Sequence, residues 1–243
     1  MIDQAVETSP RTYARIGGWL YLFIIAAGLF AEVFVRSNLI VSGDAAATAH
    51  NILASERLWR IGFAGEVFML VCDVALALIF YVLLRPVSRS LALLAAFFRL
   101  VWVAIYGVNG LTHYAALLLL GGADYLKAFA PHQLEALALL SLKLHLYGYD
   151  IGLVFFGFHC FVLGYLIFRS GYFPKFLGVL LIIAALCYVV NSFAAFVAPA
   201  FAPMMFGGLI LLPAALAEYS LCLWLIVRGI NVPKWEERVN GST

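Results

Sequence analysis

The chain has 243 residues, of which 65% are hydrophobic and 12% are charged, and its formal net charge is +2. A soluble domain is about half apolar and about a quarter charged, and a soluble core of this size cannot hide such an excess. The composition therefore excludes a soluble globular protein, and the small net charge gives no indication of nucleic-acid binding. Four cysteines lie in apolar stretches without a CxxC pair, which favours small buried hydrophobes over a disulfide framework or a zinc site.

Long apolar stretches predict an all-α fold, a polytopic bundle of six transmembrane helices that forms a single integral membrane domain over residues 1–243. A helix needs about 20 mostly apolar residues to cross the hydrocarbon core of a bilayer. Six stretches meet this requirement, at about Ala14–Val35, Trp59–Leu84, Leu91–Leu120, Gly148–Phe168, Phe176–Ala198 and Phe206–Val227. The glycines of the fourth stretch are expected to allow close packing against a neighbouring helix.

The connections between spans alternate in character. Residues 85–89 and 169–175 form tight, basic turns, whereas the loops on the other side are longer. In the first long loop, Asp44 precedes an alanine-rich run and predicts an N-cap with a short helix. In the second, Pro131 and the leucines that follow predict an amphipathic helix that lies on the membrane interface before Tyr147.

The distribution of lysine and arginine predicts the orientation in the membrane. With the N-terminus inside, nine basic residues fall in cytoplasmic tails and short turns, and five fall outside. This asymmetry favours cytoplasmic N- and C-termini. Aromatic side chains near the predicted interfaces, Trp59 among them, are typical of an aromatic belt.

Ionisable residues at bilayer depth are costly and face the bundle interior or a watery cavity. Glu66 and Asp73 are seven residues apart in the second span, and Arg99, Tyr106 and His113 repeat at the same spacing in the third. Each set therefore shares one helix face. By predicted depth, the outer half holds Glu66, Asn109, His113, Asp150 and Asn191, and the middle holds Asp73, His159 and Glu218, with Arg99 slightly further in.

The charges within the predicted spans do not balance. Four acids, Glu66, Asp73, Asp150 and Glu218, accompany one fixed cation, Arg99. Unpaired carboxyl groups at low dielectric take up protons or attract cations. The sequence therefore predicts an outward-facing polar cavity that binds a proton, a metal ion or a cationic group.

A competing interpretation treats these polar residues as structural. Interhelical hydrogen bonds and one buried pair, Arg99 with Asp73 or with Glu218, would hold the bundle together. Glu32 could join the outer group or simply pair with Arg36, which lies one turn away.

No sequence motif indicates a cofactor. His113 and His159 are expected at different depths, which argues against a haem held by both. A metal site of Glu66, His113 and Asp150 matches the depths, but neither an HExxH motif nor tight ligand spacing supports it.

Three sets of stretches resemble a known bacterial family, the domain of unknown function 4386. They are residues 14–22, residues 85–94 with 98–100, and residues 150–159 continuing through 164–167 to 169–175. The resemblance extends over nearly the whole chain and implies a multi-pass protein of the bacterial inner membrane. It implies no activity, substrate or catalytic residue.

Three functional hypotheses remain open. In the first, Glu66, Asp73, His113 and Glu218 hold or move a proton or a cationic ligand, with Arg99 as the internal counter-charge. In the second, an intramembrane enzyme acts on a lipid or isoprenoid head group through Glu66, His113 and Asp150. In the third, the chain is a non-catalytic membrane subunit or regulator whose polar residues only pack the bundle. The sequence leaves the ligand and the oligomeric state open.

Overall fold

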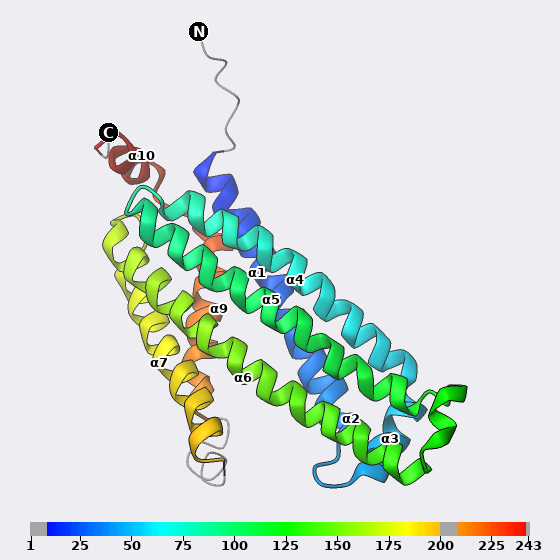
Figure 1. The fold of residues 1–243 in the computed structure, drawn as a ribbon. Helices are drawn as coiled ribbons and strands as arrows, with labels where there is room; N and C mark the ends of the chain where they lie inside the picture. The colour runs from blue at the N-terminus through cyan, green and yellow to red at the C-terminus, as the bar shows by residue number, and fades with distance from the viewer. Residues whose placement is uncertain (1–8, 200–208, 242–243) are drawn as a thin grey trace. The chain divides into compact units, whose positions relative to one another are not determined.

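The computed structural model describes residues 9–199 and 209–241, which are helical, with turns between the helices and no β-strand (Figure 1). The elements are α1 (Pro10–Leu29), η1 (Phe30–Arg36), α2 (Ser37–Leu39), α3 (Ala45–Ala54), α4 (Glu56–Leu84), α5 (Arg89–Leu120), η2 (Asp124–Ala128), α6 (Pro131–Ser170), α7 (Lys175–Val197), η3 (Leu209–Leu211), α9 (Leu212–Val227) and α10 (Val232–Asn240). The predicted all-α fold class is confirmed.

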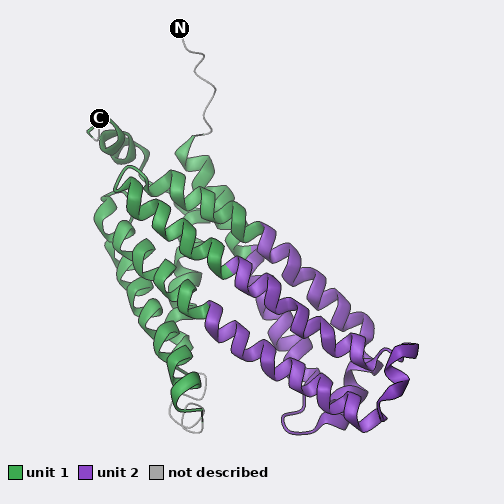
Figure 2. Ribbon diagram, viewed as in Figure 1, with its two compact units in different colours: residues 1–22, 72–102, 153–243 green, residues 23–71, 103–152 purple. Residues whose placement is uncertain are grey.

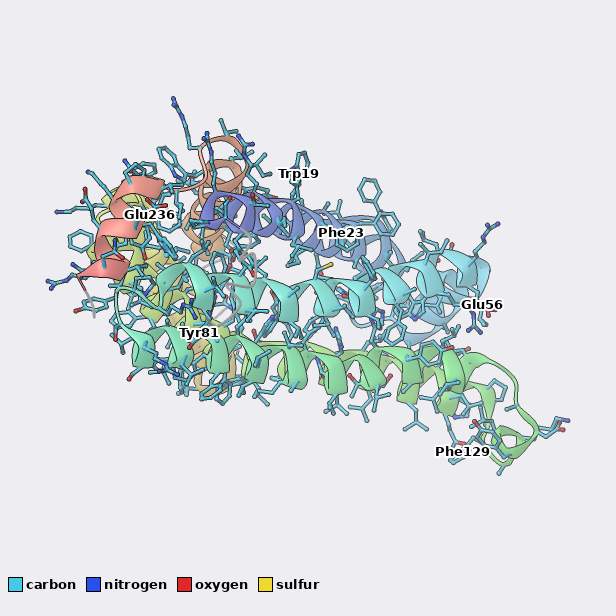
Figure 3. All side chains as sticks on the ribbon, turned by 90° about the horizontal axis from the view of Figure 1, so that it is seen from above. Trp19, Phe23, Glu56, Tyr81, Phe129 and Glu236 are labelled. Carbon is cyan, nitrogen blue, oxygen red and sulfur yellow. The ribbon has the colours of Figure 1, made fainter. Side chains whose placement is uncertain are left out.

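Six helical segments in the described residues are long and apolar enough to cross a membrane. Their surfaces carry large apolar side chains that point away from neighbouring helices, as Trp19, which is 61% exposed, does in Figure 3. Such surfaces are stable against lipid and not against water. The chain is therefore a multi-pass membrane protein.

The largest difference from the predicted boundaries concerns α6. The interfacial helix expected after Pro131 and the span expected from Gly148 form one continuous helix of 40 residues. Pro131 starts the helix as predicted, and no further proline occurs before Pro174 to end it. A helix of this length is about 60 Å long, roughly twice the hydrocarbon thickness, so α6 tilts or extends beyond the hydrocarbon. At the sixth span, the predicted start at Phe206 lies outside the described residues.

The chain divides into two compact units (Figure 2). Of the described residues, those within 1–22, 72–102 and 153–243 belong to unit 1, and those within 23–71 and 103–152 belong to unit 2. Helices α1, α4, α5 and α6 contribute residues to both units, whereas α7 and α9 belong to unit 1, where they pack against each other.

Glycines bring α6 and α7 together in unit 1. A Cβ atom placed on Gly164 would lie 2.7 Å from the carbonyl oxygen of Gly178, and one placed on Gly178 would lie 2.5 Å from the carbonyl oxygen of Gly164. Both distances are too short for a real side chain. The expectation that glycines of the fourth span allow close helix packing is confirmed at Gly164.

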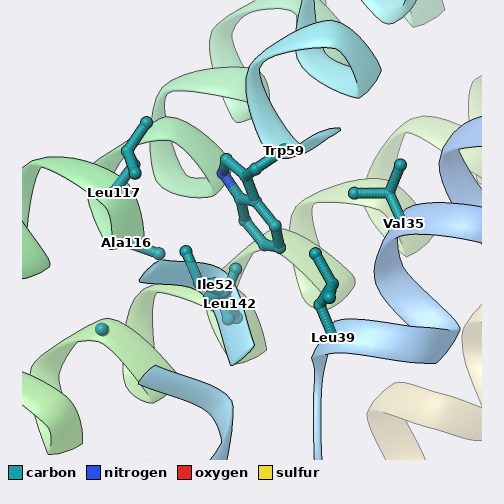
Figure 4. Packing of buried hydrophobic residues seen from close by; sticks show 8 residues of the cluster. Val35, Leu39, Ile52, Trp59, Ala116, Leu117 and Leu142 are labelled. Atoms are coloured by element: carbon teal, nitrogen blue, oxygen red, sulfur yellow. The ribbon is translucent and has the colours of Figure 1, made fainter. Parts of the chain in front are cut away.

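The core of unit 2 surrounds Trp59, which is fully buried (Figure 4). The cluster consists of Val35, Leu39, Ile52, Trp59, Ala116, Leu117, Ala138 and Leu142. The assignment of Trp59 to an interfacial aromatic belt is therefore wrong, because its indole ring packs between helices. The predicted N-cap is confirmed: the carboxylate of Asp44 accepts a hydrogen bond of 2.9 Å from the backbone of Ala47, at the start of the helix that delivers Ile52.

Two side chains hold the carboxyl end of α4 in unit 1. The hydroxyl of Tyr172 donates to the carbonyl oxygen of Leu83 at 2.7 Å, and the indole nitrogen of Trp235 donates to the same oxygen at 3.0 Å. Burial raises the pKa of the Tyr172 phenol, so this hydroxyl remains a donor throughout the physiological range. The carbonyl end of the helix thus receives partners from the turn after α6 and from α10.

Substitution of Gly178 tests the close approach of α6 and α7. We expect Gly178→Ala to lower the free energy of unfolding by about 1–3 kcal/mol, the usual range for overpacking. Gly65→Ala is the matched control, because a Cβ atom at Gly65 meets nothing within 4 Å. Thermal unfolding of the two variants in detergent measures the difference, and equal destabilisation would contradict this packing.

Candidate functional site

Arg99 is the centre of a polar network inside unit 1, where only 1% of its surface is exposed. Its Nε donates to Oδ1 of Asp73 at 2.8 Å, and its Nη2 donates to the same oxygen. Its Nη1 lies 3.0 Å from Nε2 of His159, whose Nδ1 lies 2.8 Å from the carbonyl oxygen of Ala95. Because a carbonyl only accepts, Nδ1 of His159 carries the hydrogen and Nε2 accepts from the guanidinium. The expected buried pair is thus Arg99 with Asp73.

Three aromatic rings surround the guanidinium of Arg99. Its Cζ lies 5.5 Å from the ring centroid of Tyr21, 5.8 Å from that of Phe80 and 5.4 Å from that of Phe156. Aromatic faces attract a cation, most strongly where water is excluded. Within the described part of the chain, no polar atom of Arg99 or of its two side-chain partners is buried without a hydrogen bond. The network is therefore closed, as the structural interpretation requires.

Glu218 adds a second carboxyl group to unit 1. It is half-buried on α9 and accepts a hydrogen bond from the hydroxyl of Tyr188. The hydroxyl of Tyr21 also faces it, and both Arg99 and Asp73 act on it electrostatically. Asp73, His159 and Glu218, predicted near the middle of the membrane with Arg99 slightly further in, all interact with Arg99 within this unit.

Glu66 is the centre of a different network, in unit 2, where 4% of its surface is exposed. Its Oε1 accepts a hydrogen bond of 2.5 Å from Nη1 of Arg36 and one of 2.5 Å from the hydroxyl of Tyr106. Its Oε2 lies 3.3 Å from Nδ1 of His113. One carboxylate oxygen therefore has two donors, whereas the other faces only the histidine.

The pairing of Glu66 with Arg36 corrects the predicted charge balance, which left Glu66 without a fixed cation. The helix was expected to end at Val35, but it continues through the π-helix η1 and through α2 to Leu39. Arg36 consequently stays beside α4 and bonds both Glu66 and Glu32, the latter at 2.8 Å. π-Helical turns are rare and occur often at functional sites.

His113 and His145 lie side by side next to this carboxylate, with ring centroids 5.0 Å apart. His113 is 1% exposed, and neither ring nitrogen has a hydrogen-bond partner among the described residues. The Nδ1 of His145 lies 3.2 Å from the backbone carbonyl of Asn109, whose side-chain amide donates to the carbonyl of His145 at 2.8 Å. Asn109 therefore fixes His145, while His113 keeps both nitrogens unsatisfied.

Sequence reasoning missed His145 because it assigned this residue to an interfacial helix. A usable signal was present: Ala138, Leu142, His145 and Tyr149 follow one another at intervals of four, three and four residues, which places them on one face of a helix. The first three of these side chains are buried. Reading that face through to the span would have placed His145 inside the bundle.

Two candidates do not join either network. Asp150 is half-buried, and no charged group of the described chain acts on it. Asn191 is half-buried on α7, and its side chain makes no hydrogen bond to another described residue.

The donor atoms of the described residues also bear on the metal hypothesis. They include no group of three or more His, Cys, Asp or Glu side chains that could hold a metal ion. Glu66 and His113 meet, but Asp150 does not complete a ligand set with them. Both ring nitrogens of His159 are engaged by Arg99 and Ala95.

The chain matches the family model described as a domain of unknown function (DUF4386) over residues 16–229. It belongs to this family. An uncharacterised protein of Archaeoglobus fulgidus is 29% identical over 170 residues, which cover 68% of this chain and 82% of that protein. No solved structure matches the chain. Both networks lie within the part that matches the DUF4386 model.

Variants at Arg99 and Asp73 test whether the closed network is structural. We expect Arg99→Met to cost about 3–5 kcal/mol of stability, because it leaves a buried carboxylate without its cation. The double variant Arg99→Met, Asp73→Leu removes both charges and should recover most of this loss. Chemical unfolding in detergent measures the cycle. A double variant no more stable than Arg99→Met would show that the charge pair is not the main role of Asp73.

Proposed function

We propose that this DUF4386 protein is a proton-handling protein of the bacterial inner membrane, in which Glu66 and His113 together bind and release one proton. The observation that carries the proposal is the contact between Oε2 of Glu66 and Nδ1 of His113, 3.3 Å apart and almost fully buried. Neither nitrogen of this histidine has a hydrogen-bond partner among the described residues.

The charges around Glu66 favour the uptake of one positive charge. Arg36 serves two carboxylates, Glu32 and Glu66, so the three residues together carry one net negative charge when His113 is neutral. A proton on His113 cancels this charge. It also gives Oε2 of Glu66 a charge-assisted hydrogen bond, which is about twice as strong as a neutral one. No other described group donates a hydrogen bond to Oε2, so protonation of His113 displaces no existing bond there.

The surroundings of the pair contain further groups that can bind protons. Glu32, which shares Arg36 with Glu66, is exposed over 58% of its side chain. On the other side of His113, the ring of His145 lies 5.0 Å away. Histidine and carboxylate chains of this kind are the usual proton relays within membranes.

The excess of basic residues in the tails and short turns supports an orientation with both termini in the cytoplasm. In this orientation, the loops at residues 40–55 and 121–130 are extracytoplasmic. The Glu66–His113 pair would then exchange protons with the outer side.

Of the alternatives, the structural one best describes the network of Asp73, Arg99 and His159, whose polar atoms are satisfied. The intramembrane enzyme needs Asp150 beside Glu66 and His113, and nothing in the described residues supports that arrangement. A small cation in place of the proton would neutralise the same charge, and the experiments below separate the two.

Difference infrared spectroscopy of lipid-reconstituted protein during a pH jump tests proton binding. We expect wild-type protein to show a change in the carboxyl and imidazole bands, and Glu66→Gln and His113→Gln each to remove most of it. The glutamine at position 66 can still accept from Arg36 and Tyr106, so the fold should persist. Glu56→Gln and His132→Gln, at exposed positions, are the matched controls. A Glu66→Gln spectrum identical to wild type would refute the proposal.

Proteoliposomes with an internal pH-sensitive dye test whether the bound proton moves. Under a potassium diffusion potential, we expect a proton flux through wild-type protein that Glu66→Gln and His113→Gln each reduce to the level of empty liposomes. A flux that requires external sodium, with no infrared change on the pH jump, would assign the site to a cation in place of a proton.

A further inference from the structure

A pocket of about 330 Å³ lies at one end of unit 1. None of the residues that line it belongs to either polar network. The turn between α6 and α7 and the segment after α9 form its walls, and Trp224 in the last turn of α9 completes them. The aromatic and polar residues that line it are Tyr172, Phe173, Trp224, Arg228 and Asn231.

The backbone builds this pocket through two glycines with positive φ. Gly171 has φ of 79° and turns the chain after α6, and Gly229 has φ of 66° and ends α9. The left-handed region suits glycine because it has no Cβ atom. The backbone nitrogen of Asn231 donates to the carbonyl oxygen of Tyr172 at 3.3 Å and ties the two walls together.

Arg228 is the only charged residue that lines the pocket within the described chain. It is exposed, and its guanidinium makes no hydrogen bond or ion pair with another described residue. A guanidinium presents a planar fork of donors that matches phosphate oxygens. The hydrogen-bond donors of this guanidinium are therefore available to a ligand in the pocket.

Strongly apolar surface continues from the pocket along two membrane-spanning helices. Leu223 and Val227 on α9 are 56% and 65% exposed, and Phe176 at the start of α7 is 53% exposed. The ring of Phe176 contacts Trp224 edge to face, with centroids 6.1 Å apart. One surface thus joins a cationic pocket to an apolar strip. This combination is complementary to the charged head group and the apolar chains of a phospholipid.

The local charge is complementary to an anionic head group. Residues 169–175 and 228–238 contain five basic and two acidic side chains. Basic residues beside a membrane attract anionic lipids, and tryptophan is enriched at the level of the head groups.

We propose that this pocket binds the head group of an anionic phospholipid, with the phosphate on Arg228 and the acyl chains along Phe176, Leu223 and Val227. The proposal is independent of proton binding at Glu66 and His113. It assigns a lipid ligand to a part of the chain that the two polar networks do not use.

Native mass spectrometry of the full chain, with phosphatidylglycerol and phosphatidylcholine added in equal amounts, tests this site. We expect wild-type protein to retain one phosphatidylglycerol about tenfold more tightly, a typical gain for one charge-assisted contact at a partly buried site. Arg228→Gln should lose this preference, and Arg228→Lys should keep only part of it, because lysine lacks the planar fork.

Arg169→Gln is the control, because Arg169 is an exposed cation in the last turn of α6 that does not line the pocket. It should leave the preference unchanged. An equal loss in both variants would indicate diffuse attraction by surface charge and would overturn the proposal. Inorganic phosphate that displaces the lipid at millimolar concentration would also overturn it, because the site would then recognise a free anion.

Discussion

Burial of the Arg99 guanidinium is the constraint on which the packing of unit 1 depends. An isolated charge away from water would be very costly, and even a buried ion pair adds little net stability once desolvation is counted. The pair instead restricts the ways in which the helices of this unit can pack against one another. Asp73 must come from α4, His159 from α6 and the ring of Tyr21 from α1, each at a hydrogen-bonding or cation–π distance from one point on α5. Few rotations of these helices satisfy all three conditions together.

The same requirement sets the register between α4 and α5. The tight turn at residues 85–89 makes these helices antiparallel, so seven residues backward on α4 match seven residues forward on α5. The structure contains three such pairs, each within one unit: Asp73 with Arg99, Glu66 with Tyr106, and Trp59 with His113. A seven-residue step returns to nearly the same helix face, which explains why polar residues at this spacing meet partners and not lipid.

Much of this arrangement could be predicted from the sequence, because hydropathy locates spans and periodicity locates faces. The six spans and the polar stripe through Arg99, Tyr106 and His113 were found in this way. The pairing of Arg36 with Glu66 and the burial of His145 were missed for one common reason. Arg36 and His145 both lie where a helix continues beyond the apolar run that reveals it, and hydropathy carries no signal for such a continuation. The sequence also did not indicate which side chains pair across helices, because the pairing depends on how far a side chain such as Arg36 reaches.

The two networks differ in a way that bears on function. In unit 1 the donors and acceptors around Arg99 are matched, so a change of protonation there would break bonds that hold three helices, α4, α5 and α6. In unit 2, His113 is as deeply buried but neither of its nitrogens makes a hydrogen bond with a described residue, although its Nδ1 lies 3.3 Å from a carboxylate oxygen of Glu66 that has no other donor. An unmade hydrogen bond at such a site costs about 1–3 kcal/mol. Packing of the bundle alone gives no reason to keep this unfavourable contact. A site that takes up and releases a proton, by contrast, requires a contact that lacks its hydrogen bond in one of the two protonation states.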